Sequence, residues 1–339
     1  CAMCTMAPRL VEVARHHNVE LLTNTDLVSV EGEAGNFRVK VNRRTRYVDD
    51  TKCTGCGICS QHCPVETLDE YNEGLDKRGA IFLSFPQAIP RIMTLDRNIC
   101  LGCGLCQNVC GTGAISYKME DEDRMLQVGA IIAAPGFEVF DPTAQAQYGY
   151  GRYPNVMTSI EFERALSASG PFGGLLQRPS DGRVPRNIAF IQCVGSREVE
   201  RNWCSSVCCM YATKHSLIAM EHTEGLKCTI FYIDLRAFGK GFDAYYNRAK
   251  EAGVRYVRCK PSAIREIPES KNLKVKCQVE NALPSEEEFD MVVLSCGLKP
   301  SPSSVDLAGK LGLKLNAFNF CATDTFKPLE TGRDGIFVC

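Results

Sequence analysis

Apolar and polar positions alternate near the start of the chain in a way that is typical of β-strands. Residues 17–42 predict a strand, a short connector and an alternating strand pair closed by the turn "GEAGN". Residues 123–137 predict a further strand pair that ends at Gly136. When residues 47–119 are left out, these segments join into one β-meander. The pattern therefore predicts a separate module inserted into a loop of an α/β domain.

A second α/β pattern occupies residues 186–300. The stretch "RNIAFIQC" predicts a strand, "SSVCCMYATKHSLIAMEHT" a helix and "KCTIFYIDLR" a second strand. Another helix in "GFDAYYNRAKEAG", a third strand in "VRYVRCKPSAIREI", a meander and a last strand in "FDMVVLSCGLKPSP" follow. Such alternation predicts a doubly wound α/β fold. Asp234 ends the second strand, where a dinucleotide-binding domain holds an acidic residue for a ribose hydroxyl.

The predicted organisation is α/β throughout. Residues 1–46 and 120–150 form part of a first domain, 47–119 the inserted module, 151–300 a second domain, and 301–339 return to the first. The chain begins with Cys1 instead of Met and stops inside an apolar run, so we expect it to be a piece of a longer protein.

Composition narrows the possible partners. The chain has a formal net charge of −1 and 45% hydrophobic residues, which gives no reason to expect nucleic acid or an anionic membrane as partner. The longest apolar run, residues 128–137, is too short for a transmembrane segment, and no signal peptide is visible.

Twenty cysteines are the strongest compositional signal. A chain this long is not a small disulfide scaffold, and most of the cysteines fall in short-spaced groups, so we expect metal ligation in a reducing, cytoplasmic compartment. The scattered cysteines lie mostly in apolar runs and are expected to be small buried hydrophobes. They are Cys228, Cys259, Cys277, Cys296 and Cys321.

Two groups within the inserted module match the C-x2-C-x2-C-x3-C run of two-cluster ferredoxins. The first is Cys53, Cys56, Cys59 and Cys63, followed by Pro64; the second is Cys100, Cys103, Cys106 and Cys110, followed by Gly111. In such modules the fourth cysteine of each run ligates the other cluster. We therefore expect one [4Fe-4S] cluster on the first three thiols and Cys110, and another on the second three and Cys63. A four-cysteine zinc site is the alternative, but zinc ribbons pair two separate C-x2-C knuckles.

The third group lies where a dinucleotide-binding domain would carry G-x-G-x-x-G after its first strand. Here the loop is "QCVGSRE", with one glycine, and the group consists of Cys193, Cys204, Cys208 and Cys209. The spacing C-x10-C-x3-C-C is not a ferredoxin spacing. It leaves a third cluster, a redox disulfide and buried structural thiols as alternatives.

With these residues in view, the sequence resembles the heterodisulfide reductase A-subunit family. The resemblance is carried by "YVDDTKCTGCGICSQHCP", "GYGRYPNVMTSIEFERALSASGPFGG", "RPSDG", "IQCVGSRE", "CSSVCCMYATKH" and "FYIDLRAFGKGF". It implies a thioredoxin-reductase-like flavoprotein frame, FAD, and flavin-based electron bifurcation or confurcation in anaerobic metabolism. It also implies cytoplasmic complexes with other heterodisulfide-reductase-like subunits, hydrogenase or dehydrogenase subunits, and ferredoxin.

The resemblance further implies roles for single residues. The third group would hold a non-standard [4Fe-4S] cluster, which makes three clusters in all. Lys214 would lie near the flavin N5 and tune it; a solvated helix lysine is the plainer alternative. Glu163, with Glu161, is a weaker flavin-site candidate. Gly136, Asp334 and Gly335 are the expected FAD contacts.

Three features depart from the family pattern. The G-x-G-x-x-G of the FAD domain is absent, as if it lay upstream, the chain stops where the family continues toward the FAD, and a C-terminal ferredoxin module that some members carry is missing. Cys1 and Cys4 could ligate a further, fourth cluster together with thiols outside this sequence, or form a redox or buried pair.

Two other functions compete with bifurcation. One is a passive electron relay in a related complex, such as a benzoyl-CoA-reductase-type or quinone-interacting oxidoreductase. The other is a dithiol oxidoreductase that uses Cys208 and Cys209. The second is disfavoured because redox pairs prefer C-x-x-C and a disulfide between adjacent cysteines strains the backbone.

Overall fold

The computed structural model describes residues 2–279 and 282–339. It divides into two compact units, Cys1–Phe137 with Pro300–Cys339, and Glu138–Lys299. Residues 138–150, which the sequence pattern assigned to the first domain, belong to the second unit. There β9 (Glu138–Val139) pairs with β18 (Leu298–Lys299), and Phe140 enters the core.

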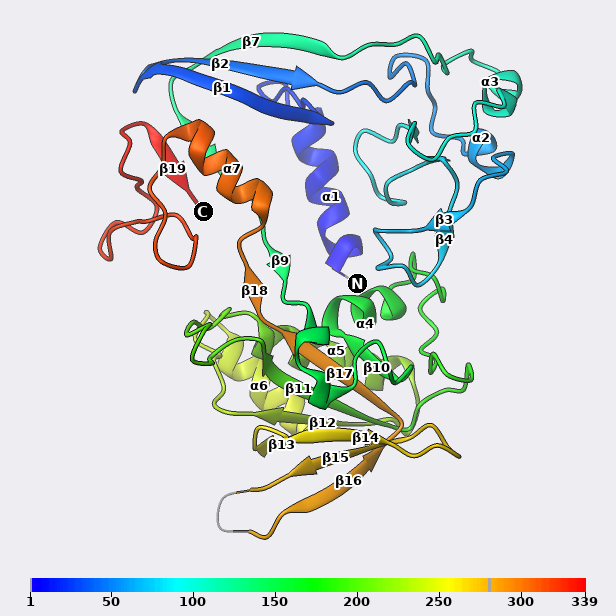
Figure 1. The fold of residues 1–339 in the computed structure, drawn as a ribbon, viewed down its shortest axis with the longest axis vertical. Helices are drawn as coiled ribbons and strands as arrows, with labels where there is room; N and C mark the ends of the chain where they lie inside the picture. The colour runs from blue at the N-terminus through cyan, green and yellow to red at the C-terminus, as the bar shows by residue number, and fades with distance from the viewer. Residues whose placement is uncertain (1, 280–281) are drawn as a thin grey trace. The chain divides into compact units, whose positions relative to one another are not determined.

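The first unit is built on an antiparallel meander of three strands, which follows helix α1 (Ala2–Arg15). The strands are β1 (Thr25–Glu33), β2 (Asn36–Arg43) and β7 (Glu122–Val128). β2 pairs with β7 from Phe37↔Val128 to Arg43↔Glu122, although 78 residues separate the two strands in the chain (Figure 1). The meander predicted across the insertion is therefore confirmed, whereas residues 16–24 form no strand.

A second layer of the first unit combines a segment from the middle of the chain with its C-terminal part. β8 (Ile131–Ala133) pairs in parallel with β19 (Ile336–Val338), so β7 and β8 do not form the predicted strand pair with each other. Helix α7 (Pro302–Leu311) packs against β1, and its Leu311 joins Phe37 and Ile336 in a buried cluster. Pro302 at the first helical turn and the Ser301 cap explain where this helix begins.

The inserted module has its own core. Two short helices, α2 (Ile58–Gln61) and α3 (Leu105–Val109), contact each other, and a bridge between Val48 and Ile115 joins the two ends of the insertion. Its short strands pair as β3 (Thr67–Leu68) with β4 (Lys77–Arg78), and β5 (Ile81–Phe82) with β6 (Thr94–Leu95). The core contains buried cysteines among aliphatic residues, which agrees with a module organised around thiols.

The second unit contains a parallel sheet in the order β10-β17-β11-β12-β13. The strands are β10 (Val156–Thr158), β11 (Asn187–Val194), β12 (Lys227–Tyr232), β13 (Arg255–Arg258) and β17 (Met291–Cys296). The connecting helices are α4 (Ser159–Leu166), α5 (Cys208–His222) and α6 (Phe242–Glu251). The predicted strand–helix alternation is confirmed, except that the third predicted strand divides into β13 and β14 (Ala263–Glu266) of different sheets.

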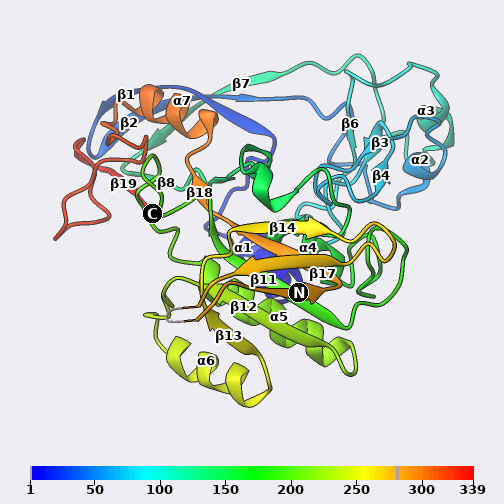
Figure 2. The ribbon, with the colours of Figure 1, turned by 60° about the horizontal axis from the view of Figure 1, so that its bottom comes forward.

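Alternation along β11 explains the layers of this unit. Ile188 and Phe190 face one side, where Phe190 meets Phe162 of α4 edge to face at 5.4 Å between ring centroids. Ala189 and Ile191 face the other side and share a core with the antiparallel sheet of β14, β15 (Leu273–Cys277) and β16 (Ser285–Phe289). Figure 2 shows α5 and β14 on opposite sides of the parallel sheet.

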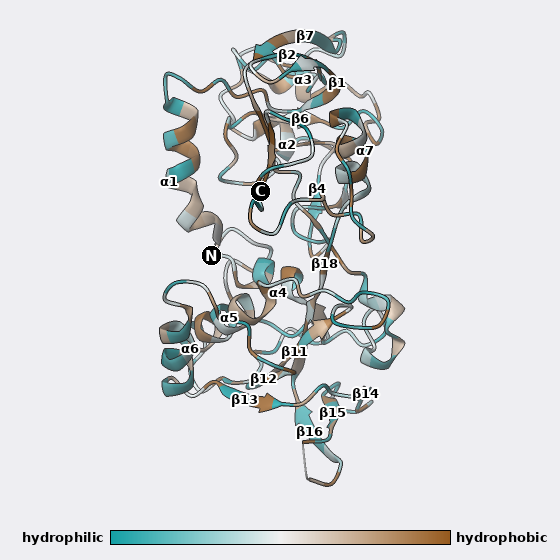
Figure 3. Cartoon of the chain, turned by 90° about the vertical axis from the view of Figure 1, so that its left-hand side faces the viewer, coloured by the Kyte–Doolittle hydropathy of each residue, from teal (hydrophilic) through white to brown (hydrophobic). Residues whose placement is uncertain are grey.

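Two short 3-10 helices, η1 (Pro142–Ala144) and η2 (Ala146–Tyr148), lead from β9 toward the sheet, and Tyr148 donates to the carbonyl of Pro261. Helix α6 is largely hydrophilic (Figure 3), and of its residues only Ala249 is buried. None of the helices in the described ranges has the length and apolar character needed to cross a lipid bilayer.

Candidate metal and cofactor sites

The two ferredoxin-like motifs fold into matching loops. Each short helix begins after a glycine in the left-handed region, Gly57 (φ 81°) before α2 and Gly104 (φ 75°) before α3. A side chain is disfavoured at such a backbone angle, which explains the glycine at the same place in both motifs. Each turn then carries one buried cysteine, Cys59 in α2 and Cys106 in α3.

The cysteines of the first predicted set come from both motifs and line one cavity. A cavity of about 150 Å³ is lined by Cys53, Cys56, Cys59 and, from the second motif, Cys110. Burial, together with the neighbouring thiols, raises the pKa of Cys59 to about 11. Burial opposes ionisation of Cys110 as well, but hydrogen bonds from Thr112 and from backbone amides lower its pKa. The four groups thus form one all-sulfur cradle with its own amide donors.

The second set gathers around Tyr117. The hydroxyl of Tyr117 lies 3.2 Å from the thiol of Cys106. Burial, this hydrogen bond and the thiols of Cys106, Cys100 and Cys103 raise the pKa of Tyr117. Cys63, the predicted fourth ligand, packs against the same core.

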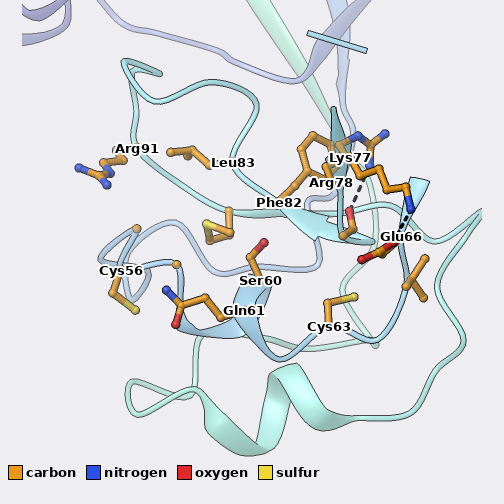
Figure 4. A pocket seen from close by; sticks show the side chains of 15 residues that line it. Cys56, Ser60, Gln61, Cys63, Glu66, Lys77, Arg78, Phe82, Leu83 and Arg91 are labelled. Carbon is orange, nitrogen blue, oxygen red and sulfur yellow. Dashed lines mark hydrogen bonds and ion pairs between the residues drawn. The ribbon is translucent and has the colours of Figure 1, made fainter. Parts of the chain in front are cut away.

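An open pocket of about 550 Å³ lies beside the first motif (Figure 4). Ser60 and Gln61 line one side and Phe82 and Arg78 the other, with Lys77 paired to Glu66 at 2.7 Å. The pocket also reaches Cys56 and Cys63. A Cβ on Gly79 would lie 3.4 Å from the thiol of Cys63, so this glycine keeps the space at that thiol open.

The third thiol set stands at the end of β11 and the start of α5. Cys193 has φ 61°, an uncommon angle for a residue with a side chain, and Cys208 and Cys209 are the first two residues of α5. Burial, with the thiols of Cys209, Cys208 and Cys204, raises the pKa of Cys193 to about 11. The structure therefore brings all four predicted residues of this set together.

The thiols of the two adjacent cysteines point toward different strands. Cys208 Sγ lies 3.7 Å from the carbonyl oxygen of Cys296, and Cys209 Sγ lies 3.9 Å from that of Asp234. The amide of Ser206 donates to Cys204 Sγ at 3.3 Å. Because the two thiols diverge, they are suited to bind different irons of one cluster. The same divergence is unfavourable for a disulfide between them.

Phe140 packs against the loop after β11, in the place where a dinucleotide-binding domain would hold phosphates. A Cβ on Gly195 (φ 72°) would overlap the ring of Phe140. Asp234, expected at a ribose position, is engaged by the guanidinium groups of Arg197 and Arg236. Arg197 and Phe140 had no such role in the sequence pattern, and only their contacts reveal it.

Across residues 2–279 and 282–339, no three Cys, His, Asp or Glu side chains converge closely enough to hold a single metal ion. The four thiolates that ligate a [4Fe-4S] cluster each bind a different iron, so they are spaced more widely than the ligands of a single metal ion. The donor chemistry of the first and third sets, four thiols each, fits iron–sulfur clusters.

Lys214 lies on α5, five residues after Cys209, and lines a pocket of about 470 Å³. The other lining residues are Ser206, Val207, Met210, Tyr211, Lys240, Gly241, Phe242 and Tyr245. Lys214 Nζ lies 3.3 Å from both oxygens of Glu163, and His215 Nε2 lies 2.8 Å from one of them. The His215 bond, with Lys214 beyond it, lowers the pKa of Glu163 to about 2 although burial opposes this. Lys214 is therefore held by a partner and faces an aromatic pocket.

The two glutamates of α4 have different partners. Glu161 forms a capping box with Thr158 at the start of the helix and accepts from the Tyr150 hydroxyl at 2.8 Å. His215 was missed by the sequence analysis. Its spacing four residues after Tyr211 on a helix is an ordinary core pattern, and only its contact with Glu163 sets it apart.

The expected FAD contacts do not come together. Gly136 (φ 73°) follows the carboxyl end of β8, whereas Asp334 and Gly335 precede the amino end of its parallel partner β19. Ligands of such sheets bind outside the carboxyl ends of strands. Gly136 is placed for that role, and the positions of Asp334 and Gly335 do not fit it.

The remaining cysteines follow the sequence expectation with one difference. Cys228, Cys259, Cys277 and Cys296 are buried, and Cys321 is half-buried. Cys4 is exposed on α1, and Cys1 lies outside the described residues.

Residues 52–114 match the family model described as a 4Fe-4S dicluster domain. The whole chain aligns with the iron–sulfur A-subunit of CoB–CoM heterodisulfide reductase from Methanocaldococcus jannaschii, at 45% identity. It aligns at 46% with one of the A-subunits from Methanopyrus kandleri and at 40% with the A-subunit of the H2:CoB-CoM heterodisulfide,ferredoxin reductase of Methanothermobacter thermautotrophicus. All three alignments cover 100% of this chain and 52% of the relative, so the chain spans about half the length of these curated relatives.

Among solved structures, a thioredoxin reductase from Lactococcus lactis superposes with a TM-score of 0.39 at 16% identity, covering 76% of this chain and 75% of the other. A thioredoxin reductase from Streptococcus pyogenes gives a TM-score of 0.33 at 13% identity, covering 66% and 59%.

Proposed function

Because the chain belongs to the heterodisulfide reductase A-subunit family, we propose that it is the electron-transfer part of an iron–sulfur and flavin oxidoreductase. The observation that carries the proposal is the gathering of thiols into sets. One is crossed between two ferredoxin-like motifs, and one stands where a dinucleotide loop would lie. Cys53, Cys56, Cys59 and Cys110 would hold one cluster, and Cys100, Cys103, Cys106 and Cys63 the second. Cys193, Cys204, Cys208 and Cys209 would hold the third.

Residues of this chain would prepare each site for its cluster. Hydrogen bonds from Thr112 and from the amides near it already favour the thiolate of Cys110. Burial excludes water from Cys59 and Cys193 and keeps both thiols protonated until a metal displaces the proton. Cluster binding should therefore release protons at the buried thiols.

The proposed flavin partner of these clusters is FAD. A bound flavin exchanges electrons both in pairs and singly, which links a two-electron donor to one-electron clusters. Lys214 would present its ammonium to the ring from the aromatic pocket, with Glu163 holding the lysine in place.

The relatives' names suggest the setting. One relative is named as a reductase of a CoB–CoM heterodisulfide and ferredoxin with H2, and another as ferredoxin- and F420H2-dependent. We extend this to the present chain as a cytoplasmic complex with heterodisulfide-reductase-like, hydrogenase or dehydrogenase subunits and ferredoxin. Within it, electrons of each donor pair would be divided between acceptors of lower and higher potential.

The test is the metal and flavin content of the full-length protein purified without oxygen. We expect roughly 12 irons from this region as three four-iron clusters, together with a bound flavin. Zinc in place of iron, or fewer than about 8 irons, would contradict the proposal. A full iron complement without flavin would favour a passive relay instead.

A further inference from the structure

Asp234 lies two residues after β12, at the place where a dinucleotide-binding domain keeps a free carboxylate. Here the carboxylate binds Arg197 through one oxygen, and Arg236 approaches the other at 3.1 Å. Both arginines lower the pKa of Asp234, although burial opposes them. Both oxygens of this carboxylate are already engaged by arginines, which points to a role other than ribose binding.

Arg197 belongs to the loop that connects two residues of the third thiol set. Its amide donates to the carbonyl of Trp203 at 3.1 Å, which brings it back to the residue before Cys204. Its side chain is 24% exposed, against 43% for Arg236. The guanidinium therefore stands in a partly buried position beside the loop that begins at Cys193.

Asp234 approaches the same thiol set from the segment that follows β12. Its carbonyl oxygen lies 3.9 Å from Cys209 Sγ, and its carboxylate extends to Arg197. The ion pair thus ties the segment after β12, next to Cys209, to the loop after β11.

We propose that Asp234 is a positioning residue that holds the Arg197 guanidinium against the third thiol set, where its positive charge raises the reduction potential of the bound cluster. The inference rests on the third cluster of the proposed function. A reduced cluster carries one more negative charge than an oxidised one, so a nearby cation stabilises the reduced form. The effect is larger in a partly buried site than in water because screening is weaker there.

The pKa directions agree with this geometry. Burial alone would lower the pKa of Arg197 itself, but Asp234 and the thiols of Cys193 and Cys204 raise it.

The experiment is a potentiometric titration of the full-length protein in its complex, followed by electron paramagnetic resonance. Arg197→Gln should reduce the one-electron equilibrium constant of the third cluster about tenfold, which is a shift of about 59 mV to lower potential. The clusters of residues 52–114 provide an internal control and should keep their potentials. Arg236→Gln is the matched variant, since it removes an equal charge from the more exposed side of Asp234, and its shift should be less than a third as large.

Asp234→Asn tests the positioning step without altering the arginine. Removing an anion would by itself raise the potential; loss of the held guanidinium should outweigh this and lower it, because the Asp234 side chain is 40% exposed and better screened. This variant also decides the matter if Arg197→Gln does not assemble.

Iron content is measured first for every variant. Intact iron with an unchanged or raised potential in Asp234→Asn, or equal shifts in Arg197→Gln and Arg236→Gln, would overturn the inference and leave the proposed function standing. Absence of a third cluster in the wild-type protein would overturn both.

Discussion

Cys110 shows at the scale of a single residue how two motifs become one site. It belongs to the second motif by sequence, yet its thiol lines the same cavity as Cys53, Cys56 and Cys59. Its thiolate is favoured by local donors, whereas burial disfavours that of Cys59. A ligand from each motif therefore makes the two loops dependent on each other.

Replacing Cys110 by Ser should remove the cluster of the first motif and spare that of Cys100, Cys103 and Cys106. The reason is the crossed geometry of the first thiol set. Iron analysis and electron paramagnetic resonance of the reduced protein measure the outcome, and Cys63→Ser serves as the mirror-image control. Selective loss of the second motif's cluster in Cys110→Ser would contradict the crossed assignment.

Glu163 provides a second residue-scale prediction. Glu163→Gln should destabilise the protein by about 3 kcal/mol at neutral pH, because the pKa of this carboxyl is lowered from 4.5 to about 2. A lowered pKa stabilises the folded state fully above the unfolded value and loses this effect as the pH falls toward 2. The difference between wild type and variant should therefore be the same at pH 7.5 and pH 5.5.

Denaturant unfolding at the two pH values measures this difference, and Glu221→Gln on the exposed side of α5 is the control. Burial lowers the pKa of His215, so we expect it to be neutral and Lys214 to supply the charge. A difference that disappears between pH 5.5 and 7.5 would show instead that a protonated His215 is the partner.

At the scale of elements, the junction of β11 and α5 decides which ligand the second unit can hold. In a dinucleotide-binding domain a glycine-rich turn here lets phosphates approach a helix N-terminus. In this chain Cys193 takes a left-handed angle at the strand end, and the first turn of α5 presents Cys208 and Cys209. The same strand–helix pair therefore positions thiols where it would otherwise position amides.

Gly195→Ala should distort this junction. The new methyl group would overlap the ring of Phe140, and the left-handed angle adds strain, for a combined cost of about 2–4 kcal/mol. We expect a lower unfolding temperature and partial loss of iron from the third set. Gly225→Ala is the matched control, since it has a similar angle (φ 75°) with nothing within 4 Å of its Cβ, and it should cost only about 1–2 kcal/mol. Equal effects of the two substitutions would mean that the contact with Phe140 is unimportant.

At the scale of the whole molecule, two α/β units share one chain but differ in what they can bind. The first carries the inserted dicluster module between β2 and β7, and the second carries the third thiol set. Neither contains a G-x-G-x-x-G loop within this sequence.

Titration with NADH or NADPH should produce no flavin bleaching in the isolated full-length protein at micromolar concentrations. The packing of Phe140 on Gly195 after β11 and the two arginines on Asp234 disfavour pyrophosphate and ribose here. Bleaching by dithionite is the control that the flavin is reducible. Saturable bleaching by either nucleotide would show that this unit still serves as a dinucleotide-binding domain.

The sequence by itself determined the features that depend on local spacing. Cysteine spacing, glycines at fixed positions in a motif and the periodicity of strands are all visible within about a dozen residues. The dicluster module, the meander around it and the strand–helix alternation of the second unit could therefore be predicted. The third thiol set was predicted as a group for the same reason, although spacing alone could not choose among its chemistries.

Only the tertiary structure decided what depends on distant residues meeting. Residues 138–150 joined the second unit because β9 pairs with β18, some 160 residues later in the chain. Asp234 pairs with Arg197, and Glu163 contacts His215, because the strand order and the helix packing bring these side chains together. A charge or hydrogen bond acts over a few ångströms in space, whereas a sequence pattern records only separation along the chain. These partners could therefore not be predicted from the sequence.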